Sequence, residues 1–561
     1  MSSQDQELAD LKEKLQSLHD DELPATAKRG TALQGWFMLV IDDTFTYIQF
    51  IVRTWGQAIL STPFYILDPF NLGVIYAFAT LSTIILAFML LFAIFAHFPF
   101  VQDVWDMLSK RLGGVSLASF AYPQIFSSLS SEIREAAYAT MSDPLKASSQ
   151  PSTQDIRNFD LEIAKVLMCT SALVYERNVR HFTDAVKLAK KAKITPEIIV
   201  KSAVKDGMPS ALLKLSLAGD PKTRTAITNK VKDADEKIIA VAKDWGLEYV
   251  SLSELATNTS PVCGAFFSRH HNFIILSFKG TNPIEFKEWV LDFTYSWTDP
   301  RNWLPNYGRM HKGFYESLFP PDVSDLPGNR TPYDTIRLAV QFISEYLSRN
   351  SPDRMVNLYV TGHSLGTALA STFYARAVGF PQDFGKSSKG ENLVRVRDAY
   401  CFATPIFGDP DCVKAFNSSL YSDLNNPVTL WRVTNRHDAV ATMLPEGGDY
   451  NFGSHISPTS QFHYAHLGQE IQMRRDVKTV GTGPGTMLPK GARCRVITHL
   501  GNSDGTGPKV DLPLWYRILE NTPLIGRGVG HVASSYWKRL SLVQVTNRLP
   551  YLDREHIWQD N

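Results

Sequence analysis

Ser364 lies in a short sequence whose residue types suit nucleophilic catalysis. A mostly apolar, β-branched run at 356–361 precedes the pentapeptide Gly-His-Ser-Leu-Gly at 362–366, and small residues follow over 368–377. This pattern predicts a strand, a tight turn and a helix, with the serine at the bend. The glycines leave room for the backbone to approach itself closely at such a turn. A serine held there can attack a carbonyl carbon, so Ser364 is the candidate nucleophile.

The serine needs a histidine to accept its proton and an acid to orient that histidine. G-x-S-x-G between a strand and a helix is the nucleophile elbow of α/β-hydrolases, in which the acid and then the histidine follow the serine. Asp438 comes just past a predicted strand and is the candidate acid. Asp409 is the alternative, one strand earlier, but its position before Pro410 is typical of a turn.

The surrounding sequence predicts the sheet that would position these side chains. From about residue 249, predicted strands alternate with helices, which is typical of a mainly parallel α/β sheet. A β-hairpin is predicted at 262–278, an amphipathic helix at 333–347, and further strands at 399–403 and 428–433.

Two more motifs make the chain resemble the class 3 (fungal-lipase-like) lipases over roughly 249–540. Residues 276–281, Leu-Ser-Phe-Lys-Gly-Thr, are similar to the family's Phe-Arg-Gly-Ser/Thr segment, and 310–315 are similar to its His-x-Gly-Phe strand. The resemblance implies that the N–H groups of Thr281 and Leu365, with the Thr281 hydroxyl, bind the oxyanion. It also implies a lid between the two motifs, where four apolar residues share one helical face: Phe286, Trp289, Val290 and Phe293.

The resemblance also favours one histidine over its alternatives. His466, His499 and His531 all follow the candidate acid, and His466 lies closest to it. In the family, a His-x-Gly-x-Glu segment similar to 466–470 is structural, and the catalytic histidine comes from a loop before the final helix. Residues 528–537 match that loop, so the resemblance implies His531 as the proton acceptor.

Two positions depart from the family pattern. Lys279 stands where arginine is usual, and it keeps the charge without the planar fork of a guanidinium group. Thr367 stands where glycine is usual and crowds the elbow helix slightly. Because neither change removes a catalytic group, we expect the chemistry to be retained.

The N-terminal region indicates a membrane. The charge-free run at 69–102 includes a predicted transmembrane helix at about 72–96, long enough to cross a hydrocarbon core of ~30 Å. Residues 36–67 are rich in aromatics but contain Asp42 and Asp43, so they could form a second span, the first arm of a hairpin or an interfacial helix. The acidic start does not resemble a secretory signal.

The composition of the chain reduces the number of candidate functions. The chain has 57 basic and 56 acidic residues, a balance that does not indicate a nucleic-acid partner. Its five cysteines are scattered without a C-x-x-C pair, which fits a reducing compartment and argues against a disulfide framework or a metal cluster. We therefore expect no cofactor or metal, and a catalytic domain on the cytosolic side.

Together these patterns predict an α/β-hydrolase fold with a mainly parallel central sheet, preceded by an N-terminal membrane-anchoring helical region. The expected function is a membrane-anchored serine lipase that hydrolyses triacylglycerol or diacylglycerol at the endoplasmic reticulum or a lipid droplet. The membrane segment weakly resembles that of oil-body and membrane-bound acylglycerol lipases. A phospholipase, an acyltransferase and an inactive membrane scaffold are the alternatives.

The expected divisions are a polar tail at 1–34, a membrane-associated region at 35–112, a helical connector at 113–248, the hydrolase domain at 249–545 and a tail at 546–561.

Overall fold

The protein is described from a computed structural model of the full chain. The described residues are 32–111, 122–143, 156–178, 221–252, 263–281, 296–320, 331–348, 355–387, 389–420, 428–435, 438–441, 456–457, 462–473, 480–481, 493–497, 512–522 and 525–543, with the single residues 116, 119, 181, 290, 293 and 460. Several predicted features lie outside these residues: most of the polar tail, the lid positions Phe286 and Trp289, the alternative His499, and the C-terminal tail.

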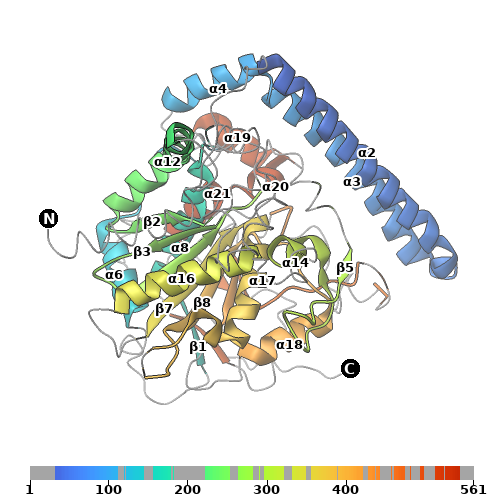
Figure 1. The fold of residues 1–561 in the computed structure, drawn as a ribbon. Coiled ribbons are helices and arrows are strands. Elements are labelled where there is room, and N and C mark those ends of the chain that lie inside the picture. The colour runs from blue at the N-terminus through green and yellow to red at the C-terminus, as the bar shows by residue number, and fades with distance from the viewer. Residues whose placement is uncertain are drawn as a thin grey trace.

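A twisted sheet forms the centre of the catalytic region (Figure 1). Within the described residues its strand order is β11-β10-β9-β8-β7-β4-β3-β2. Neighbouring strands from β4 to β10 are parallel, and the pairs β2–β3, β3–β4 and β10–β11 are antiparallel. The mainly parallel sheet and the β-hairpin at 262–278 are therefore confirmed. The strands are β2 Glu248–Ser251, β3 Cys263–Phe267, β4 Phe273–Phe278, β7 Val356–His363, β8 Val394–Phe402, β9 Leu430–Asn435, β10 Gln469–Met473 and β11 Val480–Gly481.

Helices cover both faces of this sheet, because successive strand side chains point to opposite sides. Ile274 and Leu276 join one buried cluster, while Phe273 and Ile275 join the other. On the first face lie α14 Lys312–Leu318, α16 Pro332–Ser348, α17 Leu365–Gly379 and α18 Pro410–Leu420. On the second face lie α6 Ser131–Ser142, α8 Leu161–Leu173, α12 Pro221–Asp244 and α21 Ala533–Leu542.

The expectation of a helical connector at 113–248 is wrong over Ile156–Asp160. Ile156–Asp160 forms strand β1, which pairs in parallel with β12, Arg493–Ile497. The strand is stabilised by tertiary packing, since the Phe159 ring lies against the rings of Tyr400 and Trp431. Asp160 then begins α8 as its N-cap, and α8 packs against β7 inside the second cluster. Part of the connector thus belongs to the core that supports the elbow.

Two long helices rich in apolar residues form a hairpin beside the predicted hydrolase domain (Figure 1). The helix α2 spans Ala32–Tyr65 and α3 spans Pro69–Ala96, so residues 36–67 form the first arm of this hairpin. Hydrogen bonds join the arms: Tyr47 donates to the Thr83 carbonyl at 2.9 Å, and Trp55 Nε1 donates to Thr83 Oγ1 at 3.0 Å. Among the described residues, α3 alone is long and apolar enough to cross a membrane. A shorter helix, α4 Pro99–Arg111, follows.

Candidate active site

Ser364 occupies a strained turn between β7 and α17. Its φ of 58° and ψ of −133° are rarely adopted by residues other than glycine. Two hydrogen bonds hold this backbone: the Ser364 N–H donates to the Phe402 carbonyl at 3.0 Å, and Thr367 Oγ1 donates to the Ser364 carbonyl at 2.6 Å. The unusual Thr367 therefore stabilises the elbow through its hydroxyl group.

The elbow glycines are required because backbones meet there. A Cβ atom on Gly362 would lie 2.5 Å from the Gly366 carbonyl oxygen, and one on Gly366 would overlap the carbonyl of Phe278. Both contacts are with backbone, which cannot move aside like a flexible side chain. The end of β4 thus lies directly against the start of α17.

A continuous hydrogen-bond chain joins Ser364, His531 and Asp438. His531 Nε2 lies 2.8 Å from Ser364 Oγ, and His531 Nδ1 lies 2.9 Å from both Asp438 carboxylate oxygens. An ionised carboxylate only accepts, so Nδ1 carries the proton and donates it to Asp438. The Nε2 lone pair is then free to accept the serine proton. The structure brings together the three residues that the sequence analysis selected.

The Asp438 carboxylate is fully buried and surrounded by donors. Tyr536 Oη donates to it at 2.6 Å, and the N–H groups of Val440 and Ala441 donate at 2.7 and 3.2 Å. Burial acts to raise the pKa of Asp438, but the charge and hydrogen bond of His531, with the bonds from Tyr536 and Ala441, outweigh it. The pKa therefore lies below its ordinary value, which keeps the acid ionised.

His531 lies in a turn between α20, Ile525–Val529, and α21. The turn is tied to the segment that carries Asp438: Asn435 Nδ2 donates to the Gly530 carbonyl at 2.9 Å, and the Ala439 N–H donates to the Arg527 carbonyl at 3.1 Å. These bonds fix the base and the acid relative to one another.

Two residues that the sequence analysis did not select complete the network. His363 Nε2 donates to the His531 carbonyl oxygen at 2.8 Å, and Tyr175 Oη lies 3.0 Å from His363 Nδ1. Burial, and then the charge of His531, lower the pKa of His363 to about 3, so its ring is neutral at ordinary pH. Tyr175 comes from the connector, in the turn η1, Val174–Glu176. Only the position of His363 inside the pentapeptide could have pointed to its role.

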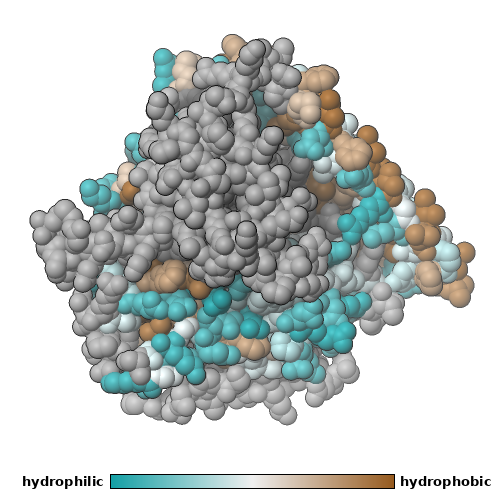
Figure 2. All heavy atoms as spheres, viewed as in Figure 1, coloured by the Kyte–Doolittle hydropathy of each residue, from teal (hydrophilic) through white to brown (hydrophobic). Residues whose placement is uncertain are grey.

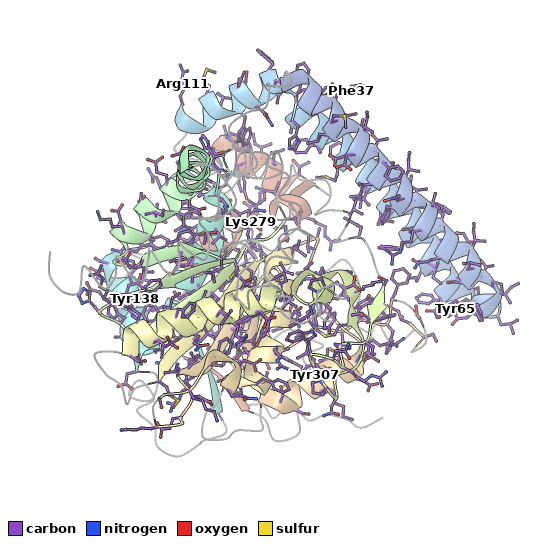
Figure 3. The ribbon with its side chains drawn as sticks, in the orientation of Figure 1. Phe37, Tyr65, Arg111, Tyr138, Lys279 and Tyr307 are labelled. Carbon is purple, nitrogen blue, oxygen red and sulfur yellow. The ribbon has the colours of Figure 1, made fainter. Side chains whose placement is uncertain are left out.

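The candidate oxyanion donors border the serine from two sides. Leu365 is the first residue of α17 and directly follows Ser364. Thr281 follows Gly280, and Gly280 lies close to the serine: a Cβ atom added to it would be 3.0 Å from Ser364 Cβ. The side chains of Thr281 and Leu365 are buried. Lys279 Nζ donates to the Gly280 carbonyl at 3.0 Å and lies 5.8 Å above the Tyr175 ring, near the centre of Figure 3.

The alternative acid and base have other partners. Asp409 accepts from the Cys412 N–H at 2.8 Å at the start of α18 and pairs with Arg309 Nε at 3.1 Å. His466 is buried, and burial followed by the charge of Arg432 lowers its pKa well below the ordinary value. Within the described part of the chain, no group of three or more His, Cys, Asp or Glu side chains is placed to hold a metal ion.

Comparison with known proteins finds a family match for the central segment. Residues 275–447 match the family described as Lipase (class 3). This segment is similar to the class 3 lipases. It contains the elbow serine Ser364 and Asp438, whereas His531 and Tyr175 lie outside it. The resemblance of the sequence to this family is confirmed.

Individual relatives are similar over smaller parts. Triacylglycerol lipase OBL1 of Arabidopsis thaliana is 30% identical over 181 residues, 28% of this chain and 31% of that protein. Its namesake in Nicotiana tabacum is 26% identical over 151 residues, 25% of this chain and 24% of that protein. The aligned part thus spans about a third or less of these relatives.

Solved lipase structures are also similar. The Rhizomucor miehei lipase in its propeptide complex is 20% identical, with 42% of this chain and 59% of that chain covered and a TM-score of 0.27. The Lip2 lipase of Yarrowia lipolytica is 15% identical, with 43% and 73% covered and a TM-score of 0.29.

Proposed function

We propose that the protein is a serine lipase that hydrolyses carboxylic esters of acylglycerols. The observation that carries this proposal is the hydrogen-bond chain from Ser364 through His531 to Asp438, built around a class 3 lipase segment. The two relatives named as triacylglycerol lipases favour acylglycerols as the substrate class.

The proposed reaction has two halves. Ser364 Oγ attacks the ester carbonyl while its proton passes to His531 Nε2, and the N–H groups of Thr281 and Leu365 bind the resulting oxyanion. The intermediate collapses when His531 returns the proton to the departing glyceride oxygen, leaving an acyl group on Ser364. A water molecule then gives a proton to His531 and attacks the acyl carbon. The second intermediate collapses when His531 returns this proton to Ser364 Oγ, which releases the fatty acid and restores both residues.

Asp438 supports both halves without taking up a proton. Its ionised carboxylate holds the His531 ring with Nδ1 protonated and stabilises the imidazolium ion that forms in each half. The depressed pKa of Asp438 fits this role, because a protonated acid could not accept the Nδ1 hydrogen.

We also infer that the α2–α3 hairpin anchors the enzyme to a lipid membrane or droplet. Water-insoluble esters are concentrated there, so anchoring raises the effective substrate concentration at the site. The lid proposal is consistent with this location. Phe293 and Val290, the described residues on the apolar face of the predicted lid, pack with Phe50, Leu86 and Leu90 of the hairpin.

Labelling with a fluorophosphonate in detergent-solubilised membranes tests the catalytic proposal. We expect the wild type to label, Ser364→Ala and His531→Ala to lose labelling, and the control His466→Ala to retain it. Triacylglycerol, diacylglycerol and phospholipid substrates, each with and without an added alcohol acceptor, then distinguish the lipase from a phospholipase or an acyltransferase. A folded wild type that neither labels nor releases fatty acid would contradict the proposal and favour a scaffold.

A further inference from the structure

We propose that the α2–α3 hairpin lies along a lipid surface, with its outer face in the lipid and its inner face on the catalytic domain, instead of crossing a bilayer. This inference rests on the anchoring role proposed above. It differs from the transmembrane helix that the sequence predicts at 72–96, although the same apolar residues carry both.

The catalytic domain contacts α3 close to both of its ends. Near the start of α3, Asn71 Oδ1 accepts a hydrogen bond from the Ser457 N–H at 3.1 Å. Near its end, Leu90 and Ala93 pack with Phe293. At 1.5 Å per residue, Asn71 and Ala93 are separated by about 33 Å along the helix. A hydrocarbon core is also about 30 Å thick, so a spanning α3 would place Ser457 and Phe293 at opposite faces of the bilayer.

The domain surface between these two contacts is unsuited to a bilayer interior. Tyr464 packs in one cluster with Ala58 and Ala79 of the hairpin, and its ring stacks on Trp297 at 3.9 Å. The Arg309 guanidinium lies 4.9 Å above that Trp297 ring and pairs with Asp409. A spanning hairpin would bring these charges close to the hydrocarbon core, where they are costly.

The exposed side chains of the hairpin form a continuous apolar strip on its outer side. Figure 2 shows apolar residues along that edge, and Figure 3 marks Phe37 and Tyr65 near the two ends of α2. The inner residues of α3 recur every three or four positions and are buried. The outer strip consists of Phe37, Ile41, Phe45, Ile48, Val52 and Ile59 on α2, and Leu81, Ile84, Phe88, Leu91 and Phe95 on α3.

A polar stripe runs along α2 beside this outer strip. Asp42, Gln49 and Arg53 are exposed and lie seven and four residues apart, so they share one side of the helix. In a helix lying on a lipid surface, such a stripe faces the headgroups while the adjacent strip enters the acyl chains. In a spanning helix, Asp42 and Arg53 would both face hydrocarbon along about 16 Å of its length. The stripe therefore favours a lipid surface as the occupant of the outer face.

Depth measurements distinguish the two orientations. Three variants of the full-length protein each carry one new cysteine, at Leu81, Phe95 or Gln49, in a Cys494→Ser background. A fluorophore is attached to that cysteine, and the protein is bound to phosphatidylcholine vesicles. Phosphatidylcholines with a nitroxide at a shallow or a deep position then quench the fluorophore according to its depth. The native cysteines Cys169, Cys263, Cys401 and Cys412 are buried and remain unlabelled in the folded protein. We expect the ratio of deep to shallow quenching to agree within about 1.5-fold for Leu81→Cys and Phe95→Cys, since both would lie at one depth. The Gln49→Cys label should be quenched mainly by aqueous iodide.

Two further results bear on the proposal. Protein bound to triolein droplets covered by a phosphatidylcholine monolayer should show the same depths, because a surface helix needs no second leaflet. Deep quenching of the Leu81→Cys label several-fold above that of Phe95→Cys, or binding to bilayers alone, would overturn it in favour of a span. If the labels at Leu81 and Phe95 are quenched only by aqueous iodide while the protein is bound to vesicles, the proposal is overturned. The outer strip would then be covered by something other than lipid, such as a second copy of the protein. If the protein binds neither vesicles nor droplets, the anchoring role itself is rejected. Fluorophosphonate labelling of Ser364 reports separately on catalysis.

Discussion

The side chain of His363 donates a hydrogen bond from Nε2 to the backbone carbonyl oxygen of His531 over 2.8 Å. A carbonyl oxygen only accepts, so Nε2 carries the ring proton, and Nδ1 accepts from the Tyr175 hydroxyl at 3.0 Å. This bridge joins the residue before the candidate nucleophile to the turn that holds the candidate base. We infer that it sets the distance between Ser364 and His531.

Replacing His363 with phenylalanine should impair catalysis more than folding. The ring volume is kept, but the bonds to His531 and Tyr175 are lost, so the His531 turn can shift. We expect kcat to fall about 10- to 100-fold with KM nearly unchanged, because a displacement of about 1 Å has effects of this size. Michaelis kinetics on a soluble short-chain ester measures both constants. The control is His466→Phe, and equal losses in the two variants would contradict a specific role for His363.

The Tyr536 hydroxyl should support catalysis by holding the Asp438 carboxylate. Tyr536→Phe removes the 2.6 Å bond to Asp438, so the pKa of Asp438 should rise toward its ordinary value. A less firmly held carboxylate orients the His531 ring less well, so we expect kcat at neutral pH to fall about 10-fold, as measured by Michaelis kinetics on the same short-chain ester. Tyr307→Phe, which removes a half-buried hydroxyl bonded to Ser419, serves as the control. An unchanged kcat in Tyr536→Phe would contradict this supporting role of the hydroxyl.

The stability of the fold should decrease as the pH falls from about 6.5 toward 3. Burial lowers the pKa of His363 and of His311 to about 3, whereas an exposed histidine titrates near 6.5. Between these pH values the unfolded chain binds more protons than the folded chain. The free energy of unfolding therefore increases with pH and decreases on acidification. His311→Phe should reduce the slope of the free energy of unfolding against pH by up to about 1.4 kcal/mol per pH unit, the value for one proton. Urea unfolding at pH 7, 6, 5 and 4 measures it, and an unchanged slope would refute the prediction.

Gly280 should tolerate no side chain. A Cβ atom there would overlap the Tyr175 hydroxyl and the His363 carbonyl and approach Ser364 Cβ to 3.0 Å. We expect Gly280→Ala to lower kcat more than about tenfold and to destabilise the fold by about 1–3 kcal/mol through overpacking. Gly379→Ala is the matched control, since nothing lies within 4 Å of its added Cβ. Kinetics and urea unfolding of both variants test this, and similar values for the two would disprove it.

Much of the sheet could be predicted from sequence because its elements have strong local signals. The strand before Ser364, the hairpin at 262–278 and the helix at 333–347 each show the spacing of their structure. Strand β1 was missed because Ile156–Asp160 has no such signal, and its conformation depends on packing of Phe159 against Tyr400 and Trp431. The orientation of the hairpin likewise depends on contacts far apart in the chain, such as Asn71 with Ser457.

The sequence by itself determined the elbow and the order of its candidate partners, because a strand, two glycines and a small-residue helix are local properties. It left three histidines open until family resemblance favoured one of them. Only the tertiary structure decided that His531 lies against Ser364 and that Tyr175 and His363 brace it. These contacts join residues that are far apart in the sequence, and only the packing of helices on both faces of the sheet brings them together.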